Sequence, residues 1–407
     1  EEKKQPANNN DDNAVDQDLL DHCYGLVLGA GIGDSIGSYC EFSNAKKASS
    51  VIDLAMTMPG GGTWGSTVNA GQVTDDTELA VSLCRGIAAM INHQTKNVSD
   101  AKNTEKNVIK HIYDSKYAAK QYQVWINSDP FDIGNTTSYT LSRAPNVENM
   151  KRAAFEHNHS SRSGNLANGS LMRCMPLIVY GHKLKPSQLA QIMVEDSSLT
   201  HANPVTYVAN TCYAIAAQYL LHHSKDNEQE EQENGKRNRT AIALCEEWLK
   251  SQLQSMQDET ERQAYQEVFA WLMDCKCENM DKLQRATKQI GFVKIAFQRA
   301  FYHLYHGSEF TEAIKSTVAE GGDTDTNGCI VGGLIGAYCG LKRIQSKYVQ
   351  TIIECKPANP ERDSKFQAQV YQTEGLIEHI VANAPDEVEV KVYEMTPNDN
   401  EEESDEY

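Results

Sequence analysis

Apolar residues recur every three or four positions along most of the chain. Clear examples are the segments 74–92, 203–221 and 292–306, in which apolar residues share one face of a predicted helix. This spacing is typical of helices that pack one side against a core. Alternation typical of strands is scarce, and its best example is "DEVEVKVYEM" at 386–395. The pattern therefore predicts an all-α protein with a single main domain.

Two of the predicted helices are rich in small residues. They lie in "GLVLGAGIGDSIGSYCEF" at 25–42 and in the apolar run "GCIVGGLIGAYCG" at 328–340. The first stretch looks like a dinucleotide-binding loop, but Asp34 and Ile36 occupy the positions where that motif requires its third glycine. Glycines at this density instead indicate a helix that another backbone crosses closely, and the second run suits a tightly packed buried helix.

The two ends and one internal segment differ in composition from this helical body. Residues 1–18 are polar and aperiodic, so we predict disorder there and a folded domain over 19–381. Residues 222–240 form a charged, low-complexity run that we interpret as an exposed insertion in that domain. Residues 382–407 form an acidic tail.

Composition narrows the classes of partner. The 407 residues carry a formal net charge of −18, which disfavours binding to nucleic acid or to an anionic membrane. We find no apolar stretch of membrane-spanning length and no signal-peptide pattern. The 11 cysteines are scattered without a CxxC pair, which is typical of reduced thiols buried in a core. We therefore expect a cytoplasmic protein, a monomer, with no nucleic-acid or membrane partner.

The segment "GGDTDTNGC" resembles the opening of a calcium loop. Asp323, Asp325 and Asn327, followed by a glycine, match the first half of an EF-hand. The twelfth position of such a loop requires a bidentate glutamate, and here it is Leu334 within an apolar run. The sequence therefore disfavours an EF-hand. The acidic residues either cap the N-terminus of a helix or belong to another kind of site.

A second acidic segment, "VTDDTELA", repeats this arrangement. Asp75 and Glu78 have the spacing of a helix capping box, but one cap does not need two adjacent aspartates between two threonines. Adjacent carboxylates at a helix start repel each other unless a cation or a donor lies between them. If the two helix starts face each other, an all-oxygen set forms that favours two hard ions, Mg²⁺ or Mn²⁺. The set is Thr74, Asp75, Asp76, Asp323, Asp325 and Thr326.

Three further residues lie in predicted loops where a ligand could reach them. Glu41 follows the glycine-rich helix, and Asp132 and Gly134 belong to "DPFDIGNTTS". Glu41 is either a solvated loop charge or a carboxylate over a cleft. The segment around Asp132 is either an ordinary turn and helix cap or part of a site.

A turn and a histidine complete the set of candidate residues. Asn168, Gly169 and Ser170 precede a predicted helix, where free backbone N–H groups suit an anion. The alternative is an ordinary turn with a helix cap. His201, in "LTHANPVT", is either a ligand contact or a structural histidine with satisfied hydrogen bonds.

Six separated motifs make the chain resemble the ADP-ribosylglycohydrolase family over about residues 20–345. They occur in the family's order and read "GDSIG", "TDDTELA", "DIGNTT", "NGSLMR", "THANPV" and "GGDTDTNG". They look most similar to the branch that contains the dinitrogenase-reductase-activating glycohydrolase and the arginine-specific enzymes. The resemblance implies a single compact, orthogonal all-α domain. The run at 222–240 and the acidic tail depart from the family pattern.

The resemblance also implies roles for the candidate residues. It implies two Mg²⁺ or Mn²⁺ ions bound by the six residues of the all-oxygen set. It implies a catalytic group of Asp132, Glu41 and Asp325. It implies that the substrate-binding residues are Asn168, Gly169, Ser170, His201 and Gly134.

The activity implied by the resemblance is hydrolysis of the bond between ADP-ribose and a protein side chain, with arginine as the expected linkage. The expected partners are an ADP-ribosylated protein and ADP-ribose itself. Hydrolysis of serine-linked, free or polymeric ADP-ribose is an alternative. A module that binds ADP-ribose without turnover is another.

Overall fold

The computed structural model describes residues 15–100, 112–160, 164–223, 234–363 and 375–386. These residues contain helices and no strand, apart from one isolated bridge between Ala167 and Phe292. The predicted all-α class is therefore confirmed. The candidate strand at 386–395 falls outside the described residues except for its first residue. The first 14 residues and 387–407 of the predicted acidic tail also fall outside them.

Seventeen α-helices are present in the described part of the chain. They are α1 (Gln17–Gly37), α2 (Ala45–Ala55), α3 (Asp75–Asp100), α4 (Lys116–Ile126), α5 (Asn135–Leu141), α6 (Val147–His159), α7 (Met175–Tyr180), α8 (Pro186–Ser197), α9 (Pro204–Leu221), α10 (Asn234–Ser255), α11 (Glu259–Asp274), α12 (Val293–His306), α13 (Phe310–Val318), α14 (Thr324–Cys339), α15 (Ser346–Ile353), α16 (Pro360–Asp363) and α17 (Leu376–Ala382).

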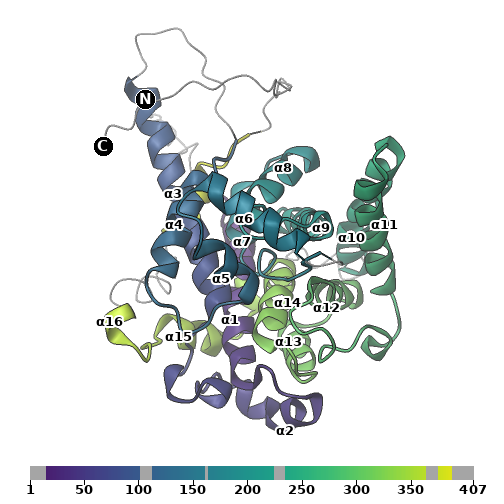
Figure 1. The fold of residues 1–407 in the computed structure, drawn as a ribbon. Coiled ribbons are helices and arrows are strands. Elements are labelled where there is room, and N and C mark those ends of the chain that lie inside the picture. Colours follow the sequence, from purple (N-terminus) through teal and green to yellow (C-terminus); the bar gives the residue numbers. More distant parts are fainter. Residues whose placement is uncertain (1–14, 101–111, 161–163, 224–233, 364–374, 387–407) are drawn as a thin grey trace, which may run out of the picture.

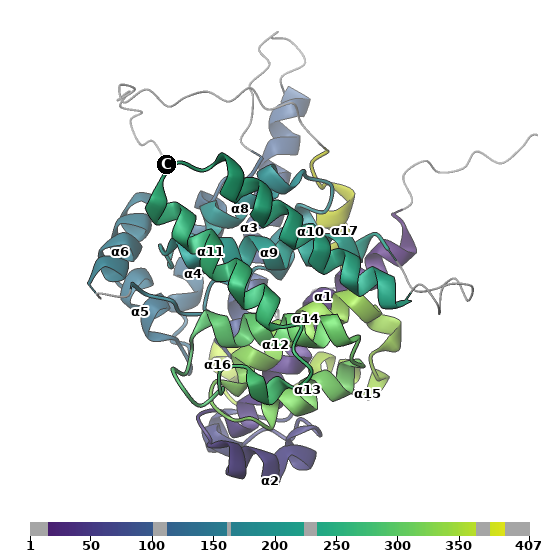
Figure 2. The same ribbon diagram turned by 90° about the vertical axis from the view of Figure 1, so that its right-hand side faces the viewer.

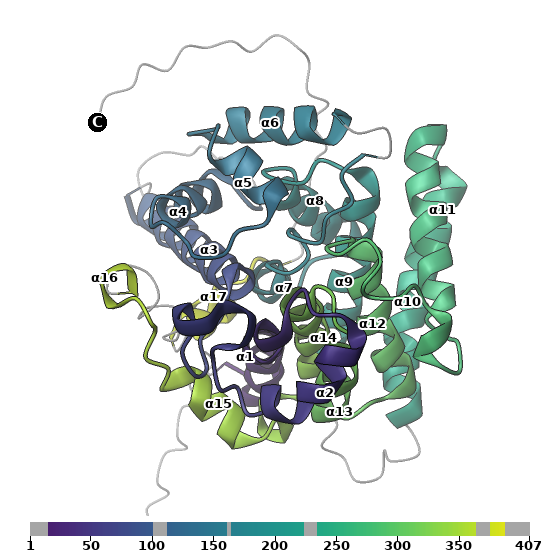
Figure 3. The ribbon, with the colours of Figure 1, turned by 60° about the horizontal axis from the view of Figure 1, so that its bottom comes forward.

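Helices α1 and α14 lie at the centre of the molecule (Figure 1). The other helices surround this pair. Helices α10 and α11 pack side by side on one flank, and α5 and α6 pack together at another edge (Figures 2 and 3). All 16 residues of α14 are buried, as the apolar small-residue run predicted. A helix that is buried on every side has no polar face, which explains why its sequence lacks amphipathic periodicity.

The contact between α1 and α14 depends on the absence of side chains. The two helices are antiparallel, and glycines four residues apart on α1 meet glycines of α14. A Cβ atom on Gly25, Gly29 or Gly33 would lie 2.2, 2.5 or 1.9 Å from a carbonyl oxygen of α14. The predicted close crossing of backbones is therefore confirmed. The opposing residues on α14 are Gly336, Gly332 and Gly328.

Helix α3 is held near its start by contacts from distant parts of the chain. The buried carboxylate of Glu78 accepts hydrogen bonds from Trp125 Nε1 at 2.6 Å and from both terminal nitrogens of Arg362 at 2.8 and 2.5 Å. Trp125 lies in α4 and Arg362 in α16. A buried carboxylate paired in this bidentate way fixes its helix in position, whereas an unpaired one would be strongly destabilising.

The structure corrects the interpretation of 222–240 as an exposed insertion for its last residues, 234–240, whereas residues 224–233 of this run lie outside the described residues. Helix α10 begins at Asn234, and both Arg237 and Asn238 are buried. Arg237 donates hydrogen bonds to the carbonyl oxygens of Tyr338 at 2.8 Å and Leu220 at 2.6 Å. Asn238 Nδ2 donates to a third carbonyl, that of Leu304, at 2.8 Å. The two polar side chains therefore donate to carbonyl oxygens in the last turns of three helices. Composition alone does not distinguish polar side chains with this role from polar side chains in solvent.

Two expectations from composition can be compared with the structure. Nine of the 11 cysteines are buried, as expected for small core hydrophobes. In the described part of the chain, no helix has both the length and the apolar character that a membrane span requires.

The α1–α14 contact predicts opposite effects for two glycines of the same helix. Gly25→Ala should lower the free energy of unfolding by about 1–3 kcal/mol or more, because the new methyl group meets the Gly336 carbonyl at 2.2 Å. Gly31→Ala should raise it by about 0.5–1 kcal/mol, since its Cβ has only ordinary contacts, the nearest at 3.4 Å, and alanine favours helix. Denaturant unfolding of both variants measures the difference. Equal effects would contradict the close backbone contact.

Candidate active site

Asp34 of α1 holds the start of α3. This fully buried carboxylate accepts hydrogen bonds from the backbone N–H of Thr74 at 3.1 Å and of Thr77 at 3.2 Å. It also accepts from their hydroxyl groups at 2.9 and 2.5 Å. An aspartate of one helix therefore caps the N-terminus of another, where free N–H groups and the helix dipole favour negative charge. The acidic segment that follows is placed by this contact.

The sequence reasoning did not assign Asp34 to the site. Asp34 lies in the "GDSIG" motif of the resemblance, but none of the site roles that were drawn from sequence included it. A usable signal was present, because Asp34 interrupts an otherwise apolar, glycine-rich helix, and a buried charge in such a helix requires partners. The pattern did not identify those partners, because Thr74 and Thr77 lie about forty residues further along the chain.

The starts of α3 and α14 face each other, as the paired acidic segments suggested. Asp76 Oδ2 accepts hydrogen bonds from Thr74 Oγ1 at 3.1 Å and from Thr326 Oγ1 at 3.3 Å, so it joins the two helix starts. Its other oxygen, Oδ1, is buried and has no hydrogen-bond partner among the described residues. A buried oxygen of this kind points to a ligand or an ion.

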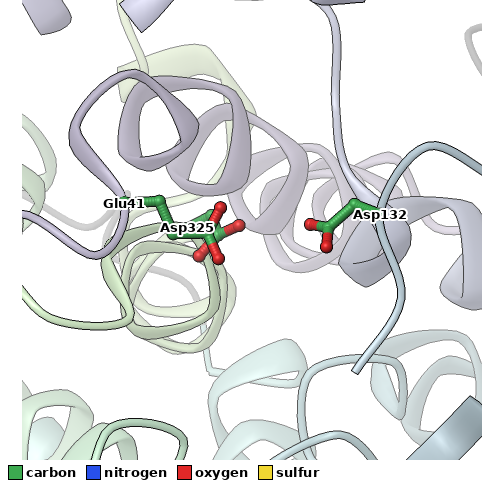
Figure 4. A group of neighbouring side chains, drawn as sticks. All are labelled: Glu41, Asp132 and Asp325. Atoms are coloured by element: carbon green, nitrogen blue, oxygen red, sulfur yellow. The ribbon is translucent and has the colours of Figure 1, made fainter. Parts of the chain in front are cut away.

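Three carboxylates from different segments converge beside this junction. Glu41 follows the short 3₁₀ helix Ser38–Cys40, Asp325 lies in the first turn of α14, and Asp132 lies in the loop before α5. One oxygen from each lies within 4.8 Å of the other two. Figure 4 shows Glu41 and Asp325 together on one side, with Asp132 directed toward them from the other. The Trp64 indole N–H also binds Glu41 Oε2, at 2.9 Å.

Two more acidic residues are held by neutral donors. Asp323, the N-cap residue of α14, accepts a hydrogen bond from Asn168 Nδ2 at 2.6 Å. Asp75, the first residue of α3, accepts one from the backbone N–H of Gly134 at 3.1 Å. These contacts bring the loops around 134 and 168, which were selected from sequence as substrate-binding segments, to the edge of the acidic cluster.

The turn at 168–170 differs from its prediction. It was expected to present free backbone N–H groups at the head of a helix, but helix α7 begins only at Met175. The Asn168 N–H already donates to the Gly291 carbonyl at 3.0 Å, and the Ser170 hydroxyl accepts a hydrogen bond from Asn210 at 3.0 Å. The side chain of Asn168 instead orients Asp323. The anion-binding interpretation is therefore wrong for the N–H of Asn168.

His201 is buried behind the same turn. Its Nδ1 atom lies 2.8 Å from the Thr200 hydroxyl, and its Nε2 atom has no hydrogen-bond partner among the described residues. Gly169 lies against the ring, because a Cβ atom there would be 2.9 Å from both Cε1 and Nε2. Burial, followed by the charge of Arg173, lowers the pKa of His201 well below its usual value. The ring is therefore neutral at physiological pH.

Burial and mutual repulsion disfavour ionisation of the acidic cluster. Burial, with the charge of Asp132 next, raises the pKa of Glu41 to about 8. Burial, with Asp75 next, raises the pKa of Asp132 to about 9. Burial also raises the pKa of Asp75 to about 8, and those of Asp76 and Asp325 well above their usual range. These groups cannot all be ionised together unless a cation shares the site.

The donor set fits hard divalent cations. The converging ligand atoms are carboxylate and hydroxyl oxygens, the ligands that Mg²⁺ and Mn²⁺ prefer over the nitrogen and sulfur typical of Zn²⁺ sites. The buried Asp76 oxygen without a hydrogen-bond partner is a further indication. The residues present are therefore compatible with the metal content that the resemblance implied.

Comparison with known proteins identifies the family of the chain. The sequence profile of the ADP-ribosylglycohydrolase family matches residues 15–381. This match covers nearly the whole described chain, and the chain belongs to the ADP-ribosylglycohydrolase family, a family of hydrolases. A solved structure named as an ADP-ribosylglycohydrolase-related protein complex shares the fold, with a TM-score of 0.57 at 18% identity over 91% of this chain and 100% of that one.

Three named relatives extend over most of the chain. A protein of Acanthamoeba polyphaga mimivirus named as an ADP-ribosyl glycohydrolase is 29% identical and covers 81% of this chain and 90% of its own length. The ADP-ribosyl-[dinitrogen reductase] glycohydrolase of Rhodospirillum rubrum is 25% identical, with 82% and 90% covered. An ADP-ribosylarginine hydrolase of Pseudomonas putida is 23% identical, with 83% and 75% covered.

The raised pKa values predict how stability depends on pH and on divalent cations. A carboxyl group whose pKa is higher in the folded state stabilises the fold fully below its unfolded pKa, and this contribution is lost as pH rises through its folded pKa. With a chelator present, the melting temperature should decrease as the pH is raised from about 5 to about 9, because Glu41 and Asp132 have folded pKa values of about 8 and 9. Mg²⁺ or Mn²⁺ should restore it at the higher pH and have little effect at the lower.

Thermal unfolding by circular dichroism measures this effect, with monovalent salt at equal ionic strength as the control. A melting temperature that does not change with pH when a chelator is present would contradict the repulsion among the buried carboxylates. Equal stabilisation by the divalent ion at both pH values would contradict its binding to ionised carboxylates.

Proposed function

We propose that the protein is a metal-dependent hydrolase that removes ADP-ribose from modified arginine side chains of other proteins. One relative supports the arginine linkage, because it is named for ADP-ribosylarginine, and another supports a protein substrate, because it is named for ADP-ribosylated dinitrogen reductase. The observation that carries the proposal is the junction of two helix starts at Asp76, with Glu41, Asp132 and Asp325 beside it. Such a cluster of buried acids has little structural benefit and a large electrostatic cost.

Six residues from the two helix starts would hold two cations, Mg²⁺ or Mn²⁺. When bound, these ions offset the repulsion among the carboxylates and polarise oxygen atoms of a bound sugar. The proposed ligands are Thr74, Asp75, Asp76, Asp323, Asp325 and Thr326. Two members of this set are oriented by neighbours: Asp34 orients Thr74, and Asn168 orients Asp323.

The chain itself supplies groups for proton transfer and charge stabilisation. Hydrolysis adds water at the anomeric carbon of the ribose, breaks its bond to the arginine nitrogen, and delivers a proton to that nitrogen. Glu41 and Asp132 are candidates for the proton donor, because burial raises the pKa of both carboxyl groups and so favours their protonated forms. We propose that the carboxylate of Asp325, which lies beside Glu41 and Asp132, stabilises positive charge that develops on the ribose ring.

The substrate side of the site is proposed to consist of the two loops beside the cluster. Gly134 lies at the N-terminus of α5, and the turn of Asn168, Gly169 and Ser170 lies against Asp323 and His201. We infer that ADP-ribose extends from the cations along these loops. We also propose that the monomer is the active form.

Turnover of defined linkages tests the proposed reaction. The full chain with Mg²⁺ or Mn²⁺ should release free ADP-ribose from ADP-ribosyl-arginine peptides, and much more slowly from serine-linked ones. Release is measured by mass spectrometry of both products. Release from serine and not from arginine would overturn the linkage. Calorimetric binding of ADP-ribose without release from any linkage would instead favour a module that only binds.

Asp325→Asn tests the role of the cluster directly. This substitution should lower kcat by about 100-fold or more, because it removes charge where the transition state needs it. Its melting temperature in a chelator should be unchanged or higher, since the change relieves repulsion. Asp53→Asn is the matched control, because Asp53 is an exposed carboxylate paired only with Lys315 at the surface. Equal turnover by the two variants would exclude the proposed site.

A further inference from the structure

A chain of buried hydrogen bonds extends behind the turn at 168–170. Arg173 and Asp196 form an ion pair at 3.2 Å, with side chains 0% and 2% exposed. The same guanidinium donates from Nη2 to the Asp196 carbonyl at 3.1 Å and from Nη1 to the Thr200 hydroxyl at 2.7 Å. The Thr200 hydroxyl lies 2.8 Å from Nδ1 of His201. The chain therefore contains four residues, with the buried carboxylate of Asp196 at one end and the imidazole ring of His201 at the other.

The carboxylate end of this chain is fixed. Asp196 Oδ1 accepts hydrogen bonds from the hydroxyl groups of Tyr113 at 3.2 Å and Tyr122 at 2.9 Å, while Oδ2 accepts from Arg173. The guanidinium carbon of Arg173 also lies 4.7 Å from the centre of the Tyr122 ring. A planar guanidinium held on both edges and on one face has little freedom to turn.

The direction of these hydrogen bonds follows from arginine chemistry. A guanidinium has only donors, so Thr200 Oγ1 accepts from Arg173. The hydroxyl then has its own proton to donate, and His201 Nδ1 is its hydrogen-bond partner in the structure. Thr200 is 1% exposed, and His201 Nδ1 is the acceptor that the described residues provide for its hydroxyl proton. If Nδ1 carried a proton, the buried hydroxyl proton would have no acceptor, which costs about 1–3 kcal/mol.

We propose that Arg173 and Thr200 are positioning residues that hold His201 as its neutral tautomer with the proton on Nε2. This N–H then faces the glycine of the 168–170 turn as a donor for an oxygen of the bound ligand. The ligand's identity rests on the proposed function, whereas the tautomer does not.

Three observations support this assignment. Nε2 is buried without a hydrogen-bond partner among the described residues, and a donor left in that state is costly unless a ligand accepts from it. Gly169 leaves this edge of the ring uncovered by any side chain. A Cβ atom at position 169 would lie only 2.9 Å from Nε2 and would cover it. Burial, followed by the charge of Arg173, also lowers the pKa of His201, so the charged imidazole does not compete with the neutral form.

Nitrogen-15 NMR of the full chain with labelled histidine tests the proposal without substrate. His201 is assigned by comparison with His201→Gln, and two-bond couplings between ring protons and nitrogens report which nitrogen is protonated. The parent protein should show the pattern of a proton on Nε2. Thr200→Val should change this pattern toward a mixture of tautomers, whereas Thr200→Ser should keep it. A proton on Nδ1 in the parent protein would overturn the proposal even if the variants failed to fold.

Thr206→Val is the matched control for loss of a buried hydroxyl. Thr206 is also buried, but its hydroxyl has no hydrogen-bond partner in the described structure, so the His201 pattern should not change. A pattern that is the same in Thr200→Val and Thr206→Val would show that Thr200 has only a structural role, and would overturn the proposal.

Ligand affinity provides the second measurement. Thr200→Val should weaken binding of ADP-ribose about three- to tenfold, the value of one hydrogen bond, while Thr200→Ser and Thr206→Val keep the parent affinity. Weaker binding together with the changed tautomer supports the proposal. Changed tautomer with unchanged affinity would overturn the donor role of Nε2. If the chain hydrolyses no ADP-ribose linkage at all, the proposed function fails, but the NMR result is still decided by the parent spectrum.

Discussion

The distance between the backbones of α1 and α14 controls the geometry of the rest of the structure. Glycines spaced by four residues allow the two helices to approach until a single methyl group would overlap a carbonyl oxygen. Asp34 is one residue from this contact, and Glu41 follows the short 3₁₀ helix that comes directly after α1. Asp323 and Asp325 lie at the start of the partner helix. A wider spacing would move the two pairs of acids apart, so packing and chemistry depend on the same residues.

The site places like charges where solvent cannot separate them. Asp34 caps the start of α3 at Thr74, and the amide of Asn168 donates to Asp323. Neither contact removes the repulsion among the buried acids. The fold therefore tolerates local instability that the rest of the core must offset. Helix N-termini reduce that cost, because their free N–H groups and dipoles favour negative charge. This is a physical reason for building an acidic site from two helix starts.

Much of the architecture could be predicted from sequence, because it depends on local patterns. Periodicity identified the helices, and glycine density identified the close crossing of α1. Paired acidic segments identified the junction at Asp76. The errors came from contacts between distant residues. Arg237 and Asn238 have the composition of a solvated loop, yet they bind the ends of three helices. Asp34 and the satisfied N–H of Asn168 were missed for the same reason, since their partners lie far away in the chain.

The pairing of Glu78 with Arg362 has a consequence for biosynthesis. The two residues are 284 positions apart, and the glycine contacts between α1 and α14 span comparable separations. A ribosome adds about 5–20 residues per second, so the N-terminal acids emerge many seconds before their partners. During that time neither helix start can be placed, and the glycine-rich α1 has no partner to cover it. We therefore infer that the acidic cluster forms only when nearly the whole chain has been made, and that nascent fragments are exposed to aggregation until then.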